Sequence, residues 1–489
     1  MNVAGKVAPE KNRADAAPLT SSRSELLADI ALFVLCACLI SVQIFVRPFI
    51  GLADNGDFPK VLGPLSLAPA VAVHHKAYFV PVFLRAPMYR WKSPLFSSEI
   101  YFARLAVGMS RLFGNHNRFD IRYLGALHAS FCLLALVALL IALHHASWKF
   151  RVPLLAFVIW VFTDAAYVAY YNSFYSDAAA FVALFVAVAL ALLIVARDSR
   201  SWMLLLAFAA SSLLFITSKG QHGILGFIPA AFIIWITWRW RRATRALAWV
   251  FAGTLLAATV AELLWLTPSW YHGVAAYNIV FYEIPKVSPD PAKDFARLGI
   301  PPEDNRFVGS LAAMDEVRTR EWFEQFSRRV SYSKLIGFYL HQPQRPLAML
   351  NDALRDAVNI RAGIGNFSPD DGLPPYAMTH RFASWSALRA KLFRRWPPHI
   401  LVWYVAVFLA TAYCATRGRS LLTRRVAIIC LAILFMGAAE FFTSALADAS
   451  ETDRHLFLFH ACTDISICFA FAALLKLVIS SLDRRTRLQ

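Results

Sequence analysis

Long uninterrupted apolar stretches dominate the chain, and ten of them are long enough to cross a bilayer as helices. The first has a long apolar core and is not followed by a small-residue cleavage site, so we interpret it as an uncleaved spanning helix. The pattern predicts an all-α polytopic membrane protein with spans near 28–46, 121–146, 153–172, 178–196, 201–217, 223–238, 246–266, 398–415, 426–446 and 461–481.

Composition agrees with this pattern. Of the 489 residues, 58% are hydrophobic and 16% are charged, whereas soluble domains have about 45–50% apolar and about 25% charged residues. The seven cysteines all fall in or beside apolar stretches without Cys-x-x-Cys spacing. They are typical of small core residues and not of disulfides or metal ligands.

The net charge of +18 comes from short clusters of Lys and Arg between the apolar stretches, without the basic stripe of a nucleic-acid-binding protein. With ten spans, these clusters share one side with both termini, which the positive-inside rule predicts to be cytoplasmic. The chain then divides into a tail (1–27), an N-terminal membrane domain (28–266) whose first outer loop is 48–120, a large outer loop region (267–397), and C-terminal membrane helices with a short tail (398–489).

Both outer loops contain helical signals. Residues 98–114 have apolar residues at helical spacing, with Arg104 and Arg111 beside them, and predict a helix on the membrane surface or one packed on the second loop. In the second loop we expect helices near 290–299, 311–329 and 345–358. Residues 361–376 are rich in Gly, Pro and Asp and predict a loop.

The first outer loop opens with a turn that carries two carboxylates, Asp54 and Asp57. Gly56 permits a positive φ and Pro59 fixes φ, so the turn is well defined. A polar turn at a helix end would explain the pattern without function. A second interpretation is a catalytic pair facing other polar groups on the outer side.

Three short outer segments supply such groups. Lys219 lies in Ser-Lys-Gly-Gln-His, and its ammonium is a natural ligand for phosphate, although a lysine at a helix end can also snorkel. Arg454 and His455 follow Asp448, Glu451 and Asp453, which suits either an ion-pair network or an arginine fork for phosphate. The third segment, 172–177, is dense in hydroxyl and amide groups at a helix hairpin tip, where an anion would be favoured.

Acidic residues within the apolar stretches are further candidates, because such residues are costly in a membrane. Asp164, Glu440 and Asp464 are of this kind. They could support a site at the outer face from the membrane side, or they could make hydrogen bonds between helices.

Carboxylates and isolated cations at one membrane face suit transfer of a sugar from a polyprenyl-phosphate donor. The phosphate leaving group needs cations rather than a general acid, and the acceptor hydroxyl needs one carboxylate base. The lipid tail of such a donor would reach the site from the bilayer.

The sequence resembles the GT-C class of glycosyltransferases, and within it the hexose transferases of bacterial surface-glycan biosynthesis. The resemblance spans nearly the whole chain and depends on Asn55-Gly56-Asp57-Phe58, Ser173-Phe174-Tyr175-Ser176-Asp177, Ser218-Lys219-Gly220-Gln221-His222, Gly365-Asn366-Phe367 and Asp453-Arg454-His455.

The resemblance implies an inverting enzyme of the bacterial inner membrane with a periplasmic site, and a glycan or lipid-linked acceptor. It assigns the catalytic carboxylate to Asp57 or Asp54; we prefer Asp57, because its neighbours Gly56 and Pro59 hold it more rigidly. The other predicted contacts are for the donor phosphate (Lys219, His222, Arg454, His455) and for substrate (Arg111, Tyr175, Ser176, Asp177, Glu451). Some members of the class use a divalent cation, for which His74, His75 or Glu99 could join the two aspartates.

The sequence is also compatible with two functions other than sugar transfer from a polyprenyl-phosphate donor. A transporter or flippase of lipid-linked glycan would have internal repeats and a polar site near mid-membrane, and neither is evident in the sequence. An O-antigen polymerase or ligase would use arginines of the large outer loop, for which Arg328, Arg329 and Arg345 are available.

Overall fold

The computed structural model describes residues 23–86, 95–114, 116–312, 319–447 and 451–486. Eight helical segments in these residues are long and apolar enough to cross a membrane. They are α1 (Arg23–Phe45), α4 (Arg122–Leu143), α7 (Ser176–Ala196), Gly220–Thr237 (η2 with α9), Arg242–Leu266 (α10 with η3), α18 (His399–Arg417), α19 (Leu421–Leu446) and α21 (Phe457–Thr486).

The two remaining predicted spans are also helical but differ in shape. The segment near 153–172 is a bent pair, in which α5 (Trp148–Phe162) and the helical residues Ala165–Asn172 meet at 52°. Asp164 lies in the break and caps α6 (Ala165–Val168) by accepting from the amide of Ala166. The helix α8 (Trp202–Ile216) has 15 residues and is shorter than a full span. The prediction of an all-α polytopic membrane protein is confirmed.

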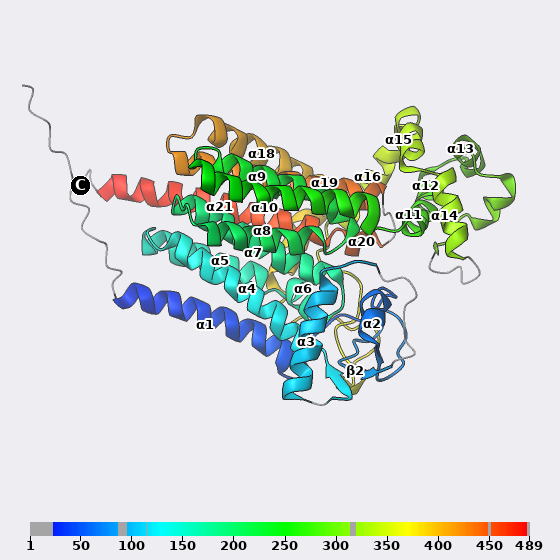
Figure 1. The fold of residues 1–489 in the computed structure, drawn as a ribbon, viewed down its shortest axis with the longest axis horizontal. Helices are drawn as coiled ribbons and strands as arrows, with labels where there is room; N and C mark the ends of the chain where they lie inside the picture. Colours follow the sequence, from blue (N-terminus) through cyan, green and yellow to red (C-terminus); the bar gives the residue numbers. More distant parts are fainter. Residues whose placement is uncertain (1–22, 87–94, 115, 313–318, 448–450, 487–489) are drawn as a thin grey trace, which may run out of the picture.

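The spanning helices form one elongated bundle around α7 (Figure 1). Buried residues make up 89% of the most apolar 18-residue stretch of α7, against 11% for α18 at the periphery. Nine of its 21 residues are alanines or similarly small side chains in SDAAAFVALFVAVALALLIVA, which lets α4 and α8 pack closely against it. The described ends of the chain, at α1 and α21, lie at one end of the bundle. The long loops cover the other, which we call the loop end.

The first long loop contains a small three-stranded antiparallel sheet, which the sequence did not predict. It consists of β1 (Leu67–Pro69), β2 (Val82–Arg85) and β3 (Arg118–Asp120) in the order β1-β2-β3, with Phe83 opposite Pro69 on one side and Phe119 on the other. Two helices accompany the sheet, α2 (Pro59–Leu65) and α3 (Glu99–Phe113). The predicted helix at 98–114 is therefore confirmed, and it exposes Tyr101, Leu105 and Leu112.

The second long loop folds mainly into short helices. They are α11 (Ser269–Tyr277), η4 (Asn278–Glu283), α12 (Ile284–Val287), α13 (Pro291–Leu298), η5 (Pro302–Phe307), α14 (Arg320–Arg329), α15 (Tyr332–His341), α16 (Gln344–Asp356), η7 (Pro369–Asp371) and α17 (Ser384–Arg394). We call α11 to α16 the outer lobe; aromatic residues such as Tyr277, Phe281 and Phe326 form its core.

In this loop, helix ends were predicted correctly where capping residues are present. Asp290 caps α13 and Gly299 ends it with φ +73°, as expected from the sequence. The helix α16 agrees with the prediction for 345–358, and residues 361–376 contain only the short turn η7. Of the predicted helix at 311–329, the described part is helical from Arg320; residues 313–318 lie outside the described residues.

The two loops are joined by backbone hydrogen bonds beside the Asp54–Asp57 turn. The amide of Ala53 donates to the carbonyl of Gly365 (2.9 Å), and the amide of Gly365 donates to that of Lys76 (2.9 Å). A Cβ at Gly365 would lie 2.2 Å from the carbonyl oxygen of Ala77, so only glycine permits this approach. The Gly365-Asn366-Phe367 stretch therefore holds the first loop in place.

Below this junction, α17 anchors the second loop to the spanning helices. Trp385 donates from Nε1 to Asp464 Oδ2 (2.7 Å), and Arg389 Nε lies 3.0 Å from Asp464 Oδ1. The amide of Ser386 donates to Asp164 Oδ2 (3.0 Å). The membrane-depth carboxylates Asp164 and Asp464 thus connect elements, which was one of the two roles expected for them.

Candidate functional site

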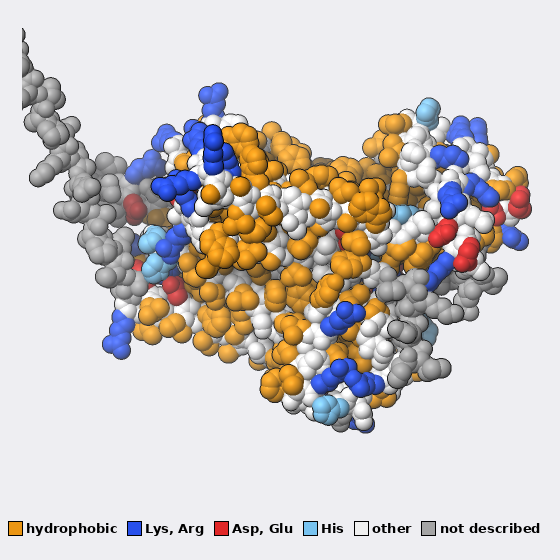
Figure 2. Space-filling model, in the orientation of Figure 1, with side chains coloured by type: hydrophobic (Ala, Val, Ile, Leu, Met, Phe, Trp, Pro, Cys, Tyr) orange, Lys and Arg blue, Asp and Glu red, His pale blue; other side chains and the backbone are white. Residues whose placement is uncertain are grey.

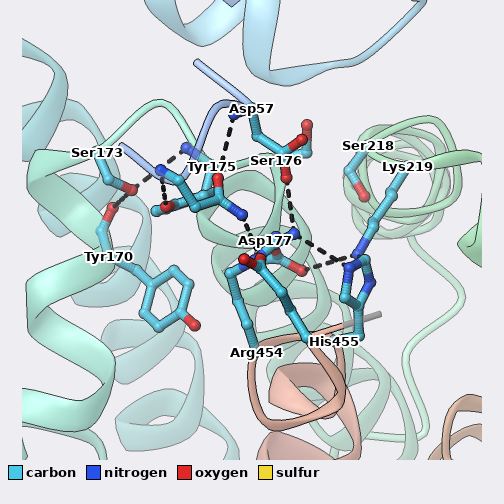
Figure 3. A network of polar contacts seen from close by, with 12 residues as sticks. Asp57, Tyr170, Ser173, Tyr175, Ser176, Asp177, Ser218, Lys219, Arg454 and His455 are labelled. Carbon is cyan, nitrogen blue, oxygen red and sulfur yellow. Dashed lines mark hydrogen bonds and ion pairs between the residues drawn. The ribbon is translucent and has the colours of Figure 1, made fainter. Parts of the chain in front are cut away.

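Four segments that are far apart in the sequence meet at the loop end of the bundle (Figure 3). They are the turn at 54–60, the hairpin tip at 173–177, the segment 218–222 and the short helix α20 (Thr452–His455). Each was singled out from the sequence, and the fold brings them into one polar cluster. We call this the charged cluster.

The turn at 54–60 is shaped by Asp54 so that Asp57 faces the other segments. Asp54 Oδ1 accepts from the amides of Gly56 (2.7 Å) and Phe58 (3.1 Å), and Gly56 has φ +107°, a conformation that glycine adopts readily. One carboxylate oxygen of Asp54 is therefore occupied by hydrogen bonds from backbone amides. Pro59 begins α2 directly behind Asp57.

Arg454 lies at the centre of the charged cluster and its side chain is only 4% exposed. It donates from Nη2 to Asp57 Oδ2 (2.7 Å), from Nη1 to Asp177 Oδ2 (3.4 Å) and from Nε to Glu451 Oε2 (3.2 Å). Its guanidinium also lies over the ring of Tyr175 at 5.1 Å, a favourable cation–π geometry. One buried cation therefore joins three carboxylates from three segments.

Lys219 completes the cationic part of the cluster. Its Nζ lies 3.7 Å from Asp177 Oδ1 and 3.0 Å from His455 Nδ1, while Arg454 Nη2 lies 3.1 Å from His455 Nε2. A neutral imidazole has one acceptor nitrogen, so both cations cannot donate to His455 in the same state. An arriving anion would offer the additional acceptors that this arrangement favours.

Each carboxylate that Arg454 binds also has a second cationic partner. Asp57 pairs with Lys60, Glu451 with Lys76, and Asp177 with Lys219. We did not assign Lys60 or Lys76 to the site from the sequence. Lys60 could have been noticed because it lies three residues after Asp57 on the same turn, whereas Lys76 depends on the loop fold.

The two aspartates of the turn differ in their electrostatics. Burial acts to raise the pKa of Asp57, but Lys60 and Arg454 outweigh it and hold that pKa well below its usual range. Burial raises the pKa of Asp54, and the backbone amides of Phe58 and Gly56 oppose this effect only in part. Asp57 is therefore an ion-paired carboxylate, and Asp54 is a more basic one.

The predicted substrate residues of the hairpin tip lie in or beside the cluster. Tyr175 donates its hydroxyl to the carbonyl of Ala53 (2.8 Å), which ties the tip to the turn. Ser176 Oγ lies 3.0 Å from Ser97 Oγ, and Asp177 contacts both central cations. The roles of these residues in substrate binding remain predictions.

His222 lies deeper than expected for a phosphate ligand. It is fully buried, with Nδ1 2.9 Å from Ser218 Oγ and Nε2 3.4 Å from Glu440 Oε1. Gln221 donates to the other oxygen of Glu440 (2.6 Å). This position suits support of the Lys219 segment better than contact with a ligand.

Arg111 and the additional metal ligands considered are not part of the charged cluster. Arg111 is exposed near the end of α3, beside Arg85 and Arg118. His74 and His75 are exposed, and Glu99 is buried against His128 (3.3 Å). Within the described ranges, no three His, Cys, Asp or Glu side chains converge as metal ligands; a divalent cation, which the sequence permits but does not require, stays an untested prediction. Asp448 lies outside the described residues.

Comparison with known proteins identifies the family. A similar solved structure is that of the oligosaccharyltransferase of Archaeoglobus fulgidus in the apo form, with 13% identity and a TM-score of 0.42 over 94% of this chain and 52% of that chain. The chain thus spans about half the length of that protein. Curated proteins give no significant sequence match. The family described as the YfdI N-terminal transmembrane domain matches residues 17–488, and the chain belongs to this family.

Proposed function

We propose that this chain is an inverting GT-C-type glycosyltransferase that moves a hexose from a polyprenyl-phosphate donor to a glycan or lipid-linked acceptor at the loop end, and that this end faces the periplasm. The basic clusters between the spans support this orientation under the positive-inside rule. The observation that carries the proposal is the pairing of Asp57 with Arg454 in a cluster that also holds Lys219. A base and two cations in one site are the groups that this reaction needs.

The leaving group defines the role of the cations. In the proposed step the acceptor oxygen forms a bond to the anomeric carbon while the bond from that carbon to the phosphate oxygen breaks. The phosphate takes the electron pair, and the acceptor proton goes to a carboxylate. Arg454 and Lys219 would bind the phosphate oxygens and stabilise their growing charge.

Asp57 is the proposed base, and its ion pairs suggest how it is activated. A carboxylate held by Lys60 and Arg454 is a poor proton acceptor. When a phosphate takes the donors of Arg454, Asp57 loses one of its two cations and its pKa rises. Donor binding would therefore activate the base, and the donor would bind before the acceptor reacts.

Asp54 is the second candidate for the base. Its pKa is raised by burial, but one of its oxygens accepts two backbone amides. The variant Asp54→Asn retains an oxygen acceptor for these amides, so it tests the carboxylate without removing the turn.

The test uses purified protein in lipid with a labelled polyprenyl-phosphate hexose and a lipid-linked acceptor. Transfer of label to the acceptor supports the proposal. Movement of intact lipid-linked glycan across liposomes, without a new glycosidic bond, would instead identify a flippase. Transfer of an entire glycan chain would identify a polymerase or ligase.

A further inference from the structure

The outer lobe has an apolar face that its own core does not cover. On α15, Ile336 is 58% exposed and Leu340 is 75% exposed, and on the next helix, α16, Leu347 is 66% exposed. Ile336 and Leu340 are four residues apart, so they lie on the same side of the helix. Tyr332, one turn earlier, extends the stripe. Three turns of one helix thus expose hydrophobic side chains.

The opposite edge of the exposed surface of α15 is polar. Lys334 and His341 are exposed, and helical geometry places both on the side away from Ile336, whereas the exposed Ser333 lies beside Leu340. The buried face, which includes Leu335 and Phe338, packs into the core of the outer lobe. The helix is therefore amphipathic on its exposed surface.

Two hydrogen bonds tie this helix to the end of a spanning helix. Tyr339 donates its hydroxyl to the carbonyl of Leu446 (3.1 Å), and Tyr332 donates to that of Ala447 (3.4 Å). These carbonyls are at the loop-end terminus of the spanning helix α19, where the chain leaves the membrane. Tyrosine is favoured at this level because its ring is apolar and its hydroxyl is polar.

The surroundings of α15 match a lipid environment. In Figure 1 this helix lies on the same side of the molecule as α18, whose side chains Leu401, Val402 and Val405 are exposed. Figure 2 shows hydrophobic side chains along the margin of the outer lobe that faces the spanning helices, whereas its charged side chains gather over the remote part. The exposed apolar surfaces of α15 and of the bundle therefore face the same side of the molecule in this view.

We propose that α15 is an interfacial helix whose stripe of Tyr332, Ile336 and Leu340 inserts into the lipid leaflet at the loop end. Lys334 and His341 then face the headgroups and water. This contact would fix the outer lobe relative to the bilayer, independently of the chemistry in the charged cluster.

The test places a fluorescent label on single cysteines in the full-length protein in nanodiscs. The background carries Cys38→Ser and Cys414→Ser, because the other five cysteines are buried. Ile336→Cys and Leu340→Cys test the stripe, and the matched control is His341→Cys on the polar edge of the same helix. Acyl-chain-brominated lipid and aqueous iodide serve as the two quenchers.

The proposal predicts quenching of the labels at 336 and 340 by brominated lipid. It also predicts roughly tenfold weaker iodide quenching at 340 than at 341, because ions enter hydrocarbon unfavourably. Equal iodide quenching at 340 and 341 would overturn it. Protection of position 340 from both quenchers would also overturn it, since that result would mean that protein covers the stripe.

Discussion

Replacing Arg454 by Gln tests the phosphate site. The variant keeps a polar side chain but removes the charge that joins Asp57, Asp177 and Glu451. Removing one member of a buried ion pair typically costs about 3–5 kcal/mol because a charge is left unpaired. Here each carboxylate keeps another cation, namely Lys60, Lys219 or Lys76. We therefore expect a smaller loss of stability, about 1.5–3 kcal/mol, as for hydrogen bonds to charged groups.

Donor binding should change more specifically than stability. The loss of one charge-assisted hydrogen bond to phosphate costs roughly 1.5–3 kcal/mol. Since about 1.4 kcal/mol corresponds to a factor of ten, the Kd for polyprenyl phosphate should rise by about 10- to 100-fold. Transfer should fall at least as much, because the phosphate charge grows in the transition state.

The assay measures the Kd of polyprenyl phosphate and the thermal unfolding of the same preparation in nanodiscs. Arg345→Gln is the matched control, because Arg345 is a largely buried arginine, 13% exposed, that pairs with Asp294 (2.7 Å) in the outer lobe. Both variants should lose stability, and only Arg454→Gln should lose donor affinity. An unchanged Kd in Arg454→Gln would refute the phosphate assignment. Loss of function in Arg345→Gln alone would favour the polymerase or ligase alternative.

Three further predictions follow from the turn and its neighbours. Gly365→Ala should lower thermal stability and transfer, because its Cβ would lie 2.2 Å from the carbonyl oxygen of Ala77. Wild-type stability and transfer in this variant would show that the close packing of residue 365 against Ala77 is not required. Lys60→Met should raise the pKa of Asp57 and move the acid limb of the pH–rate profile to higher pH; an unmoved limb would show that Asp57 does not control it. Acid unfolding should depend on Asp57 and Glu451, because both have lowered pKa values in the folded state. The stability that these carboxylates contribute is present above their unfolded pKa values of about 4 and is lost as the pH falls toward the folded values. The Glu451→Gln variant should therefore lose less stability in acid than the wild type.

The membrane architecture could be predicted because lipid imposes one dominant rule on the sequence. Every backbone group within hydrocarbon must be satisfied internally, so long apolar stretches become helices. All ten predicted stretches are helical in the structure. The bend beside Asp164 was missed, because the turn depends on the side chain of Asp164 and its contact with Ser386, over 200 residues away.

The outer loops were predicted less completely. Helix α13 has a local cap at Asp290 and a glycine stop, and these signals located it. The strands of the first loop are only three or four residues long, and they depend on pairing between segments rather than on a local pattern. Helices α15 and α17 were missed for a related reason, since contacts with α19 and α21 hold them.

The candidate site could be predicted because its charged residues are unusual in the segments that carry them. Lys219 and Arg454 attracted attention as isolated cations in outer segments, and the fold places both against Asp177. The sequence could not show that Arg454 and Asp57, 397 residues apart, form an ion pair. It also offered only the rigidity of the turn as a reason to prefer Asp57 over Asp54, whereas their different partners now distinguish the two carboxylates.

The most direct test of the account compares hexose transfer by Asp57→Asn and Asp54→Asn in the same lipid preparation, with donor binding measured in parallel. The account predicts that Asp57→Asn lowers transfer by about 100-fold or more, as expected for the loss of a general base. This variant should bind donor at least as well as wild type, because Arg454 loses a competing carboxylate, and Asp54→Asn should retain most transfer. Wild-type transfer by Asp57→Asn would contradict the account.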